Sequence, residues 1–231
     1  MLVLVDLDDT LCNTWEAGKR TLVRFLFFLF RKRKFRAILY FLAGRYKRFE
    51  RAKHVHVLDL DSIVEVVMRD IYPNISEEEL REITSNVEET FFKFLKLYPD
   101  AIPFLSGVRK LGATVVLITD SSTEWQRKKI RVLGIEDYFD DVIISGETGH
   151  SKLDDYNFQL ALRRFPSDEI YAVGDRDDTD MRGGKSIGAI TILVRRGYFK
   201  SRKVEFADYV VKDLFEALEV IRSEHKKRAE T

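Results

Sequence analysis

The chain has 231 residues, of which 45% are hydrophobic, so it fits one large domain or two small ones with a sizeable core. A formal net charge of +1 excludes a strong overall attraction to nucleic acid, and no apolar run reaches the roughly 20 residues that span a bilayer. The single cysteine excludes a disulfide framework, and no secretory leader is recognisable, so we expect a cytoplasmic protein. The 33% of charged residues is typical of thermophiles.

The first twelve residues join an apolar run, residues 2–5, to a cluster of acids that includes Asp6 and Asp8. Continuous hydrophobicity predicts a strand buried on both faces, as in a parallel α/β sheet. Ligands of open α/β sheets bind at the carboxyl ends of the strands, where Asp6 and Asp8 follow. Two carboxylates this close repel each other unless one is protonated or a cation lies between them. The alternative is a solvated acidic turn.

Residues 13–100 interrupt the strand pattern with helices, predicted over 14–53 with a break at Gly44, over 59–71, and from a capping box at Ser76. Residues 19–53 contain thirteen Lys or Arg and one acid, interleaved with aromatic residues, whereas residues 59–100 contain eleven acids and four bases. We predict that 13–100 is a helical cap domain over the acidic loop. The alternative is a packed helical subdomain without a functional role.

From residue 101 onward, strands and helices alternate, which predicts parallel pairing through right-handed crossovers. The expected fold is therefore α/β, with a core domain formed by residues 1–12 and 101–231. We expect the last residues, from His225, to be frayed. The predicted strands are 113–118, 142–144, 170–173, 189–194 and 209–211, and the predicted helices are 103–111, 124–133 with Gly134 as its cap, 151–165, a short one to about 187, and 212–226.

Polar residues follow the predicted strands, so Asp6, Asp8, Thr119, Lys152 and Asp175 are expected to meet at one edge of the sheet. A carboxylate can attack a phosphate ester only if cations neutralise the phosphoryl oxygens. Hard oxygen ligands suit Mg²⁺. The pattern therefore favours phosphoryl transfer, with Mg²⁺ held by carboxylates and a backbone carbonyl.

Four motifs, in this order, resemble those of the haloacid dehalogenase superfamily: Asp6-Leu-Asp-Asp-Thr10, Leu117-Ile-Thr-Asp120, Lys152, and Gly174-Asp-Arg-Asp-Asp-Thr-Asp180. The resemblance implies a Rossmann-like core and places the helical insertion where this family carries its C1-type cap, as in phosphoglycolate phosphatases. It also implies a phosphatase that hydrolyses a small phosphorylated metabolite. An acid at position 8 argues for phosphate esters over haloacids.

The resemblance further implies roles for single residues. Asp6 would be the nucleophile that forms an aspartyl-phosphate, and Asp8 the general acid and base. Thr119, Asp120 and Lys152 would hold the phosphoryl group, with Asp120 acting through its backbone; Lys128 and Lys185 are alternatives to Lys152. Mg²⁺ would be bound by the carboxylates of Asp6 and Asp175 and the carbonyl of Asp8, with Asp180 and Asp178 orienting its water shell.

Several alternatives remain open. A phosphomutase or a phosphonatase could use the same scaffold, the latter with Lys53 as its Schiff-base lysine. The basic aromatic stretch 19–53 could bind lipid or RNA, but we favour its Phe and Leu residues as the cap's own core, with its bases facing the acidic half; no nucleic acid is expected as a partner. Cys12 is interpreted as buried filler, His54 and His56 as surface residues, and His150 as a candidate substrate contact. The chain could be a monomer or a cap-mediated dimer.

Overall fold

The computed structural model describes residues 1–45 and 59–230, which divide into two compact units. The core unit consists of Met1–Trp15 and Lys96–Thr231, and the helical unit of Glu16–Leu95. The boundaries therefore fall at 15/16 and 95/96. His54, His56 and Lys53 lie outside the described residues. In the part of the chain that is described, no helix is long and apolar enough to cross a bilayer.

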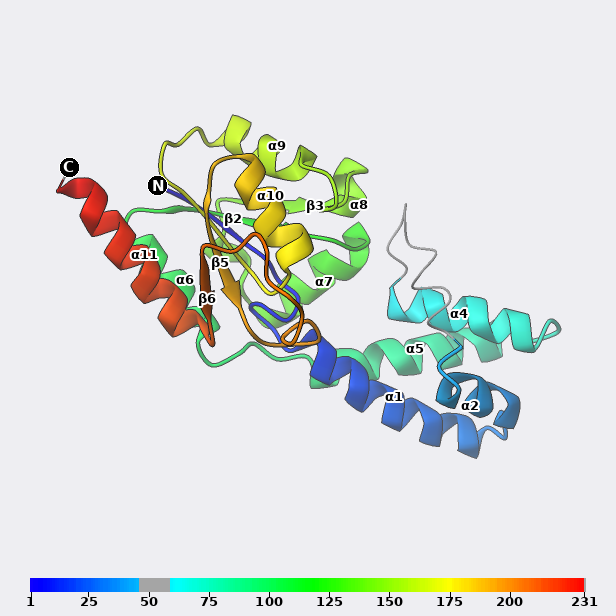
Figure 1. Ribbon diagram of the computed structural model, residues 1–231. Helices are drawn as coiled ribbons and strands as arrows, with labels where there is room; N and C mark the ends of the chain where they lie inside the picture. Colours follow the sequence, from blue (N-terminus) through cyan, green and yellow to red (C-terminus); the bar gives the residue numbers. More distant parts are fainter. Residues whose placement is uncertain (46–58, 231) are drawn as a thin grey trace. The chain divides into compact units, whose positions relative to one another are not determined.

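The core unit is built on a six-stranded sheet in the order β3-β2-β1-β4-β5-β6, with every neighbouring pair parallel (Figure 1). The central strand β1 is at most 2% exposed, as its continuous hydrophobicity predicts. The α/β fold class is thereby confirmed. The strands are β1 (Leu2–Val5), β2 (Thr114–Thr119), β3 (Asp141–Ile144), β4 (Ile170–Gly174), β5 (Ile190–Val194) and β6 (Tyr209–Val211).

Strand register explains why distant residues meet. Val5 lies opposite Leu117 of β2 and Val173 of β4, so the three strands end side by side. The backbone N–H of Asp6 continues this pairing by donating to the carbonyl of Val173 at 3.0 Å. Asp6, Thr119 and Asp175, which end these strands or follow them directly, consequently lie at the same edge of the sheet.

Helices flank this sheet, with α6 and α11 together on one side and α9 and α10 on the other (Figure 1). Phe158 and Ala161 of α9 join an apolar cluster with Leu2 and Leu4 of β1. The helices are α6 (Ala101–Lys110), α7 (Thr123–Leu133), α8 (Ser145–Thr148), α9 (Tyr156–Arg164), α10 (Arg182–Ser186) and α11 (Leu214–Ala229), with a 3-10 turn at Glu136–Tyr138 and a π turn at Asp177–Met181.

Two helix boundaries were predicted wrongly. Helix α9 begins at Tyr156 rather than Ser151, because the backbone N–H of Lys152 donates to Asp120 and not within a helix. Helix α11 continues to Ala229, so the expected fraying from His225 is wrong. The His225 ring contacts Glu169 at 2.9 Å and the Arg228 guanidinium donates to the carbonyl of Asp168 at 2.9 Å, which stabilises the last turns.

The helical unit contains α1 (Thr14–Arg31, which starts in the core unit), α2 (Phe35–Leu42), α4 (Leu60–Ile71) and α5 (Glu77–Phe94). The hydroxyl of Ser76 accepts from the backbone N–H of Glu79 at 3.2 Å, as predicted for a cap. Besides the break predicted at Gly44, the chain turns at Arg33, which adopts a positive φ of 56° between α1 and α2. Arginine carries no sequence signal for this conformation.

Only part of the aromatic stretch forms the core of the helical unit. Phe25, Leu29 and Phe41 are at most 5% exposed and pack with side chains of α4 and α5. Phe27, at 62% exposed, and Phe30, at 59%, point to solvent instead. The interpretation of the Phe and Leu residues as cap core is therefore wrong for this second set.

The segments that connect the two units are tied together inside the core unit. The backbone N–H of Asn13 donates to the carbonyl of Lys96 at 3.0 Å, and the N–H of Lys96 donates to the Asn13 side-chain oxygen at 2.7 Å. The N–H of Tyr98 donates to the carbonyl of Leu11 at 2.9 Å. The segments through which the chain leaves and re-enters the core unit are thus hydrogen-bonded to each other.

Candidate active site

Three buried carboxylates form the centre of the site. Asp6 follows β1, Asp175 follows β4, and Asp180 lies in the π turn that comes next. They are 7%, 5% and 4% exposed, and one carboxylate oxygen from each lies within 4.8 Å of the others. The structure therefore brings together two predicted metal ligands and one residue that was predicted to orient the metal's water shell.

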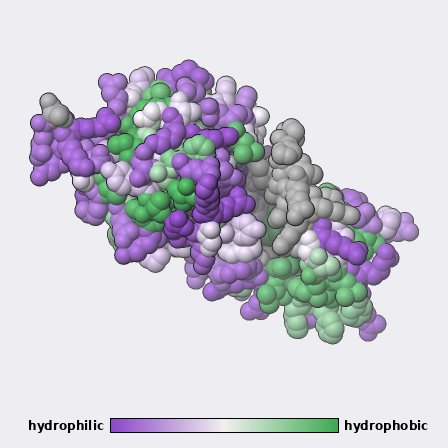
Figure 2. Space-filling view, in the orientation of Figure 1, coloured by the Kyte–Doolittle hydropathy of each residue, from purple (hydrophilic) through white to green (hydrophobic). Residues whose placement is uncertain are grey.

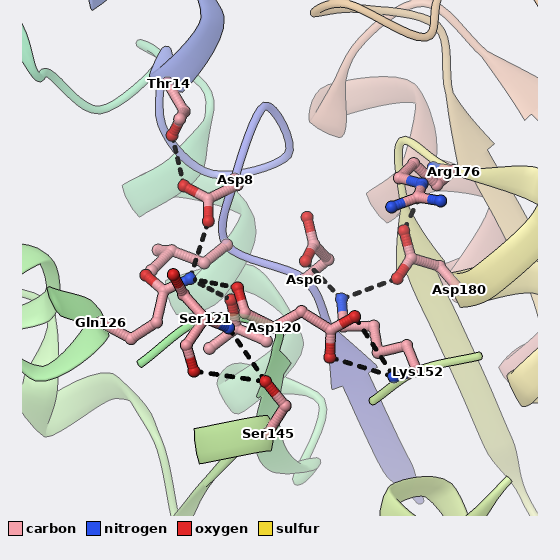
Figure 3. A network of polar contacts seen from close by, with 12 residues as sticks. Asp6, Asp8, Thr14, Asp120, Ser121, Gln126, Ser145, Lys152, Arg176 and Asp180 are labelled. Atoms are coloured by element: carbon pink, nitrogen blue, oxygen red, sulfur yellow. Dashed lines mark hydrogen bonds and ion pairs between the residues drawn. The ribbon is translucent and has the colours of Figure 1, made fainter. Parts of the chain in front are cut away.

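Lys152 reaches into this cluster from the loop before α9. Its ammonium group pairs with Oδ1 of Asp6 and, at 2.7 Å, with Oδ1 of Asp180 (Figure 3). The side chain is 5% exposed. Although burial opposes the charged form, the carboxylates of Asp180, Asp6 and Asp120 raise the pKa of Lys152, so it is a fixed cation. The alternative Lys185 instead pairs with Asp208 at the surface.

The charges in this cluster do not balance, because three carboxylates face one ammonium group. Burial raises the pKa of Asp6 to about 7, with the charges of Asp180 and Asp8 adding to it against that of Lys152. Burial, with Asp6 and Asp180 nearby, raises the pKa of Asp175 well above its usual range. The Oδ2 atoms of Asp6 and Asp175 are buried and accept no hydrogen bond within the described residues. Buried oxygens left without donors suit a hard divalent cation such as Mg²⁺.

Asp8 turns away from this cluster toward Thr14 and Gln126 (Figure 3). Its Oδ1 accepts from the Thr14 hydroxyl and from the Lys129 ammonium, the latter at 2.7 Å, and its Oδ2 accepts from the Gln126 amide at 2.8 Å. Burial would raise the pKa of Asp8, but the charge of Lys129 and these hydrogen bonds together lower it. Asp8 is therefore held as a carboxylate.

Gln126 and Lys129 were missed by the sequence reasoning. Both lie on α7 and are at most 2% exposed. The Gln126 amide also donates to the Thr119 hydroxyl at 2.9 Å and to the carbonyl of Asp120 at 2.8 Å, so it joins the end of β2 to Asp8. Their spacing relative to the buried Trp125 and Ile130 places them on the inward face of the helix, a signal that could have identified them.

The side chain of Asp120 holds the loop before α9, while the backbone role predicted for this residue stays a prediction. Both of its carboxylate oxygens accept from the backbone N–H of Lys152, at 3.0 and 3.2 Å. Its carboxylate is thereby directed at the loop that carries the lysine. Burial raises the pKa of Asp120 despite the neighbouring Lys152.

Asp9 anchors the acidic loop to the β5–β6 connection. It adopts a positive φ of 57° and accepts from the backbone N–H of Trp15 at 2.8 Å and of Tyr198 at 3.3 Å. Burial raises the pKa of Asp9 to about 6. A Cβ at Gly197 would lie 2.3 Å from the Asp9 side chain, so only glycine allows the two loops to approach this closely.

Asp178 does not join the carboxylate cluster. Its side chain is 49% exposed and pairs with Arg176 at 3.2 Å and with Arg202 at 3.4 Å. Both guanidinium groups also lie over the Phe199 ring, at 4.5 and 4.3 Å from its centroid. These residues and Asp175 line a cavity of about 130 Å³ in the core unit.

Two further predicted residues take structural positions. Cys12 is fully buried and donates to the carbonyl of Leu7, and burial raises the pKa of its thiol, which makes it unreactive. His150 stacks on Tyr156, with 3.9 Å between ring centroids, and contacts Asp154 at 3.2 Å. Neither contact directs the His150 ring at the carboxylate cluster.

A family model for hydrolases, described as haloacid dehalogenase-like hydrolase, matches residues 1–188. The chain belongs to this family. The family predicted from the four motifs is thus confirmed, and with it the expectation that the protein is an enzyme of the hydrolase class.

Curated relatives of this haloacid dehalogenase-like hydrolase are named phosphatases. It is similar to the glyceraldehyde 3-phosphate phosphatase of Methanopyrus kandleri, with 35% identity over 58% of this chain and 60% of that protein. It is 29% identical to the glyceraldehyde 3-phosphate phosphatase of Methanocaldococcus jannaschii over 96% of both chains. A phosphoserine phosphatase of Thermus thermophilus shares 35% identity over 50% of this chain and 49% of its own. The first and third matches therefore cover about three fifths and one half of those relatives.

Solved structures support the fold of this haloacid dehalogenase-like hydrolase. A HAD phosphatase from Thermococcus onnurineus superposes with a TM-score of 0.69 at 24% identity, covering 95% of this chain and 97% of that one. A 2-haloacid dehalogenase from Pseudomonas syringae gives 0.68 at 21% identity, covering 96% and 98%. At this identity the likeness concerns the fold alone.

Proposed function

We propose that the protein is a Mg²⁺-dependent phosphatase that hydrolyses a small phosphomonoester through an aspartyl-phosphate on Asp6. The observation that carries the proposal is the state of the Asp6 carboxylate. One oxygen pairs with Lys152, and the other is buried without a donor within the described residues. Lys152 thus orients the Asp6 carboxylate at the end of β1, so that one of its oxygens can attack while the other faces the proposed cation.

The reaction proceeds in two steps. A carboxylate oxygen of Asp6 forms a bond to phosphorus, and the bond between phosphorus and the ester oxygen breaks, so that the alcohol leaves with a proton from Asp8. Water then attacks the phosphorus of the aspartyl-phosphate and gives a proton to Asp8, and the bond between phosphorus and the Asp6 oxygen breaks, which releases inorganic phosphate and restores the Asp6 carboxylate. Lys152 and the hydroxyl of Thr119 hold the phosphoryl oxygens in both steps.

Asp8 requires two protonation states in this scheme. Its hydrogen bonds with Thr14, Lys129 and Gln126 favour the carboxylate, which is the form that accepts a proton from water. To protonate the leaving alcohol, Asp8 has to give up some of these bonds and turn toward the ester oxygen. Lys129 and Gln126 therefore act as positioning residues.

The residues that would hold Mg²⁺ are Asp6 and Asp175, with the carbonyl of Asp8 and with Asp180 beside them. When bound, the cation neutralises charge on the phosphoryl oxygens and on the surplus carboxylates. The two unpartnered Oδ2 atoms of Asp6 and Asp175 support this assignment.

For the substrate we propose a small phosphate ester, with glyceraldehyde 3-phosphate as the first candidate, because the relative that aligns along 96% of both chains carries that name. The helical unit, inserted after the acidic loop, would serve as a cap that selects the alcohol part. Specificity would then depend on side chains of the helical unit, whereas the phosphoryl chemistry depends on the core unit.

The test measures phosphate release from p-nitrophenyl phosphate, glyceraldehyde 3-phosphate and phosphoserine, with Mg²⁺ and with EDTA. We expect Mg²⁺-dependent release that Asp6→Asn abolishes. Asp178→Asn is the matched control, because Asp178 lies outside the carboxylate cluster. Retained activity in Asp6→Asn, or an inert wild type across a broad panel of phosphoesters, would contradict the proposal.

A further inference from the structure

Helices α1 and α2 carry a second apolar face besides the one that forms the core of the helical unit. On each helix, three large apolar residues repeat with spacings of four and three. The rings of Phe30 and Phe35 are 5.8 Å apart, which joins the two stripes across the turn at Arg33. Figure 2 shows the resulting hydrophobic area over α1 and α2. We call this set the α1–α2 face: Val23 (69% exposed), Phe27 (62%), Phe30 (59%), Phe35 (52%), Leu39 (68%) and Leu42 (65%).

Packing within the helical unit does not explain this face. The opposite sides of α1 and α2 already supply Phe25, Leu29 and Phe41 to the buried core. Monomeric proteins rarely leave a contiguous apolar patch of this kind in water unless it binds something. The high exposed fractions also mean that the side chains protrude, so they need a soft medium or a partner with pockets of its own.

From residue 19 onward, the charged residues of α1 and α2 are all basic. Residues 19–45 contain nine Lys or Arg and no acid. Lys32 and Lys34 pair with Glu82 and Glu79 of α5. Four exposed arginines lie next to the face in the sequence or in the turn between the two helices: Arg24, Arg31, Arg33 and Arg36. Within the described residues, none of these four forms an ion pair with an acid.

We infer that the α1–α2 face docks onto a membrane surface that contains anionic phospholipids. A helix that lies in the interface places Phe and Leu among the acyl chains and its arginines at the phosphate groups, which is the arrangement that these two helices present. Since neither helix is long and apolar enough to cross a bilayer, the protein lies on the surface. A second copy of the chain is a poorer occupant, because it would bring two basic rims together.

The test measures co-sedimentation of the full chain with vesicles of equimolar phosphatidylcholine and phosphatidylglycerol. We expect binding that high salt weakens. The triple change Arg24→Gln, Arg31→Gln and Arg36→Gln is expected to weaken it about a hundredfold, from about fivefold per charge. The double change Phe27→Ser and Leu39→Ser is expected to weaken it about tenfold or more.

Matched controls lie on the core unit. Phe215→Ser changes an aromatic residue that is 50% exposed on α11, and Arg131→Gln changes an exposed arginine on α7. Both are expected to bind the vesicles like the wild type, and circular dichroism checks that every variant is folded. Asp6→Asn is also expected to bind them, so failure of the proposed catalysis and failure of this inference are separate results.

Three outcomes would overturn the inference. The first is no binding to the anionic vesicles. The second is equal binding to pure phosphatidylcholine, or equal losses in the control variants. The third is a dimer, or a complex with an acidic protein, that forms without any binding to vesicles and dissociates in the Phe27→Ser and Leu39→Ser double variant. This result would assign the face to a protein interface.

Discussion

The ammonium group of Lys152 lies between the buried carboxylates of Asp6 and Asp180, and its removal leaves negative charge without a partner. We expect Lys152→Met to lower kcat about 100- to 1,000-fold, because a preorganised charge on the phosphoryl group is lost. Breaking a buried ion pair should also cost about 3–5 kcal/mol of stability in Mg²⁺-free buffer. Lys152→Arg, which keeps the charge, is the control for both measurements. Equal stability of the Met variant would contradict the ion-pair assignment.

The raised pKa values of Asp6, about 7, and of Asp175 make the metal-free protein sensitive to pH. The folded state holds these protons more tightly than the unfolded chain, in which the pKa of Asp is about 3.9. The contribution of these two carboxyl groups to the free energy of unfolding is therefore fully present below about pH 4 and is lost as pH rises toward about 7. Thermal unfolding in EDTA should show this fall in Tm. Mg²⁺ should reduce it, because a bound cation replaces the protons.

Lys129 lowers the pKa of Asp8 by a direct ion pair and a hydrogen bond. In Lys129→Met the pKa of Asp8 is expected to rise, because burial then acts without compensation. The acidic limb of the kcat profile should move to higher pH, since Asp8 must be ionised to accept the proton of water. Lys128→Met, one position earlier on α7, serves as the control. An unchanged pH profile would show that Lys129 has only a structural role.

At the scale of the elements, α7 and α8 pack with almost no free space between their first turns. A Cβ at Gly146 would lie 2.7 Å from the backbone N of Thr123 and 2.9 Å from the carbonyl O of Ser121. Because backbone cannot move aside easily, Gly146→Ala should destabilise the protein by about 1–3 kcal/mol. Gly18→Ala on α1 is the control, since no atom lies within 4 Å of the added Cβ. Alanine has the higher helix propensity, so this change should stabilise the protein by up to about 1 kcal/mol. Chemical denaturation measures both changes.

The elements also show which parts of the fold are readable from sequence. The strands and the polar residues at their ends, such as Asp6 and Thr119, could be predicted because continuous hydrophobic runs end at polar groups. Gln126 and Lys129 carry a weaker signal, since polar helix residues usually face solvent and only their spacing relative to Trp125 and Ile130 indicates the inward face. Only the packing of α7 against the acidic loop buries them. The turn at Arg33 was missed because its positive φ belongs to a helix end, where the backbone N–H of Lys34 donates to the carbonyl of Leu29 at 2.9 Å, and this position usually carries glycine.

At the scale of the whole molecule, the chain combines a sheet that was predictable with a helical unit that was predictable only in outline. Periodicity identified helices in residues 13–100, but it could not separate the apolar residues of the core, such as Phe25, from those of the exposed face, such as Phe27. Two apolar stripes on one helix give a single hydrophobic signal. The distinction required the packing of α4 and α5 against one side of α1 and α2.

The hydrogen bonds of Asn13, Lys96 and Tyr98 have a consequence for how the substrate range of such a protein can evolve. The two segments of the core unit that flank the helical unit are hydrogen-bonded to each other, so the points at which the insert begins and ends are fixed by the core unit. An insert of another length could be joined at the same two points without a change at Asp6 or its neighbours. Under the proposed role of the helical unit in substrate selection, new substrates would be acquired by replacing residues 16–95 as one piece, while the carboxylate cluster of the core unit stays unchanged.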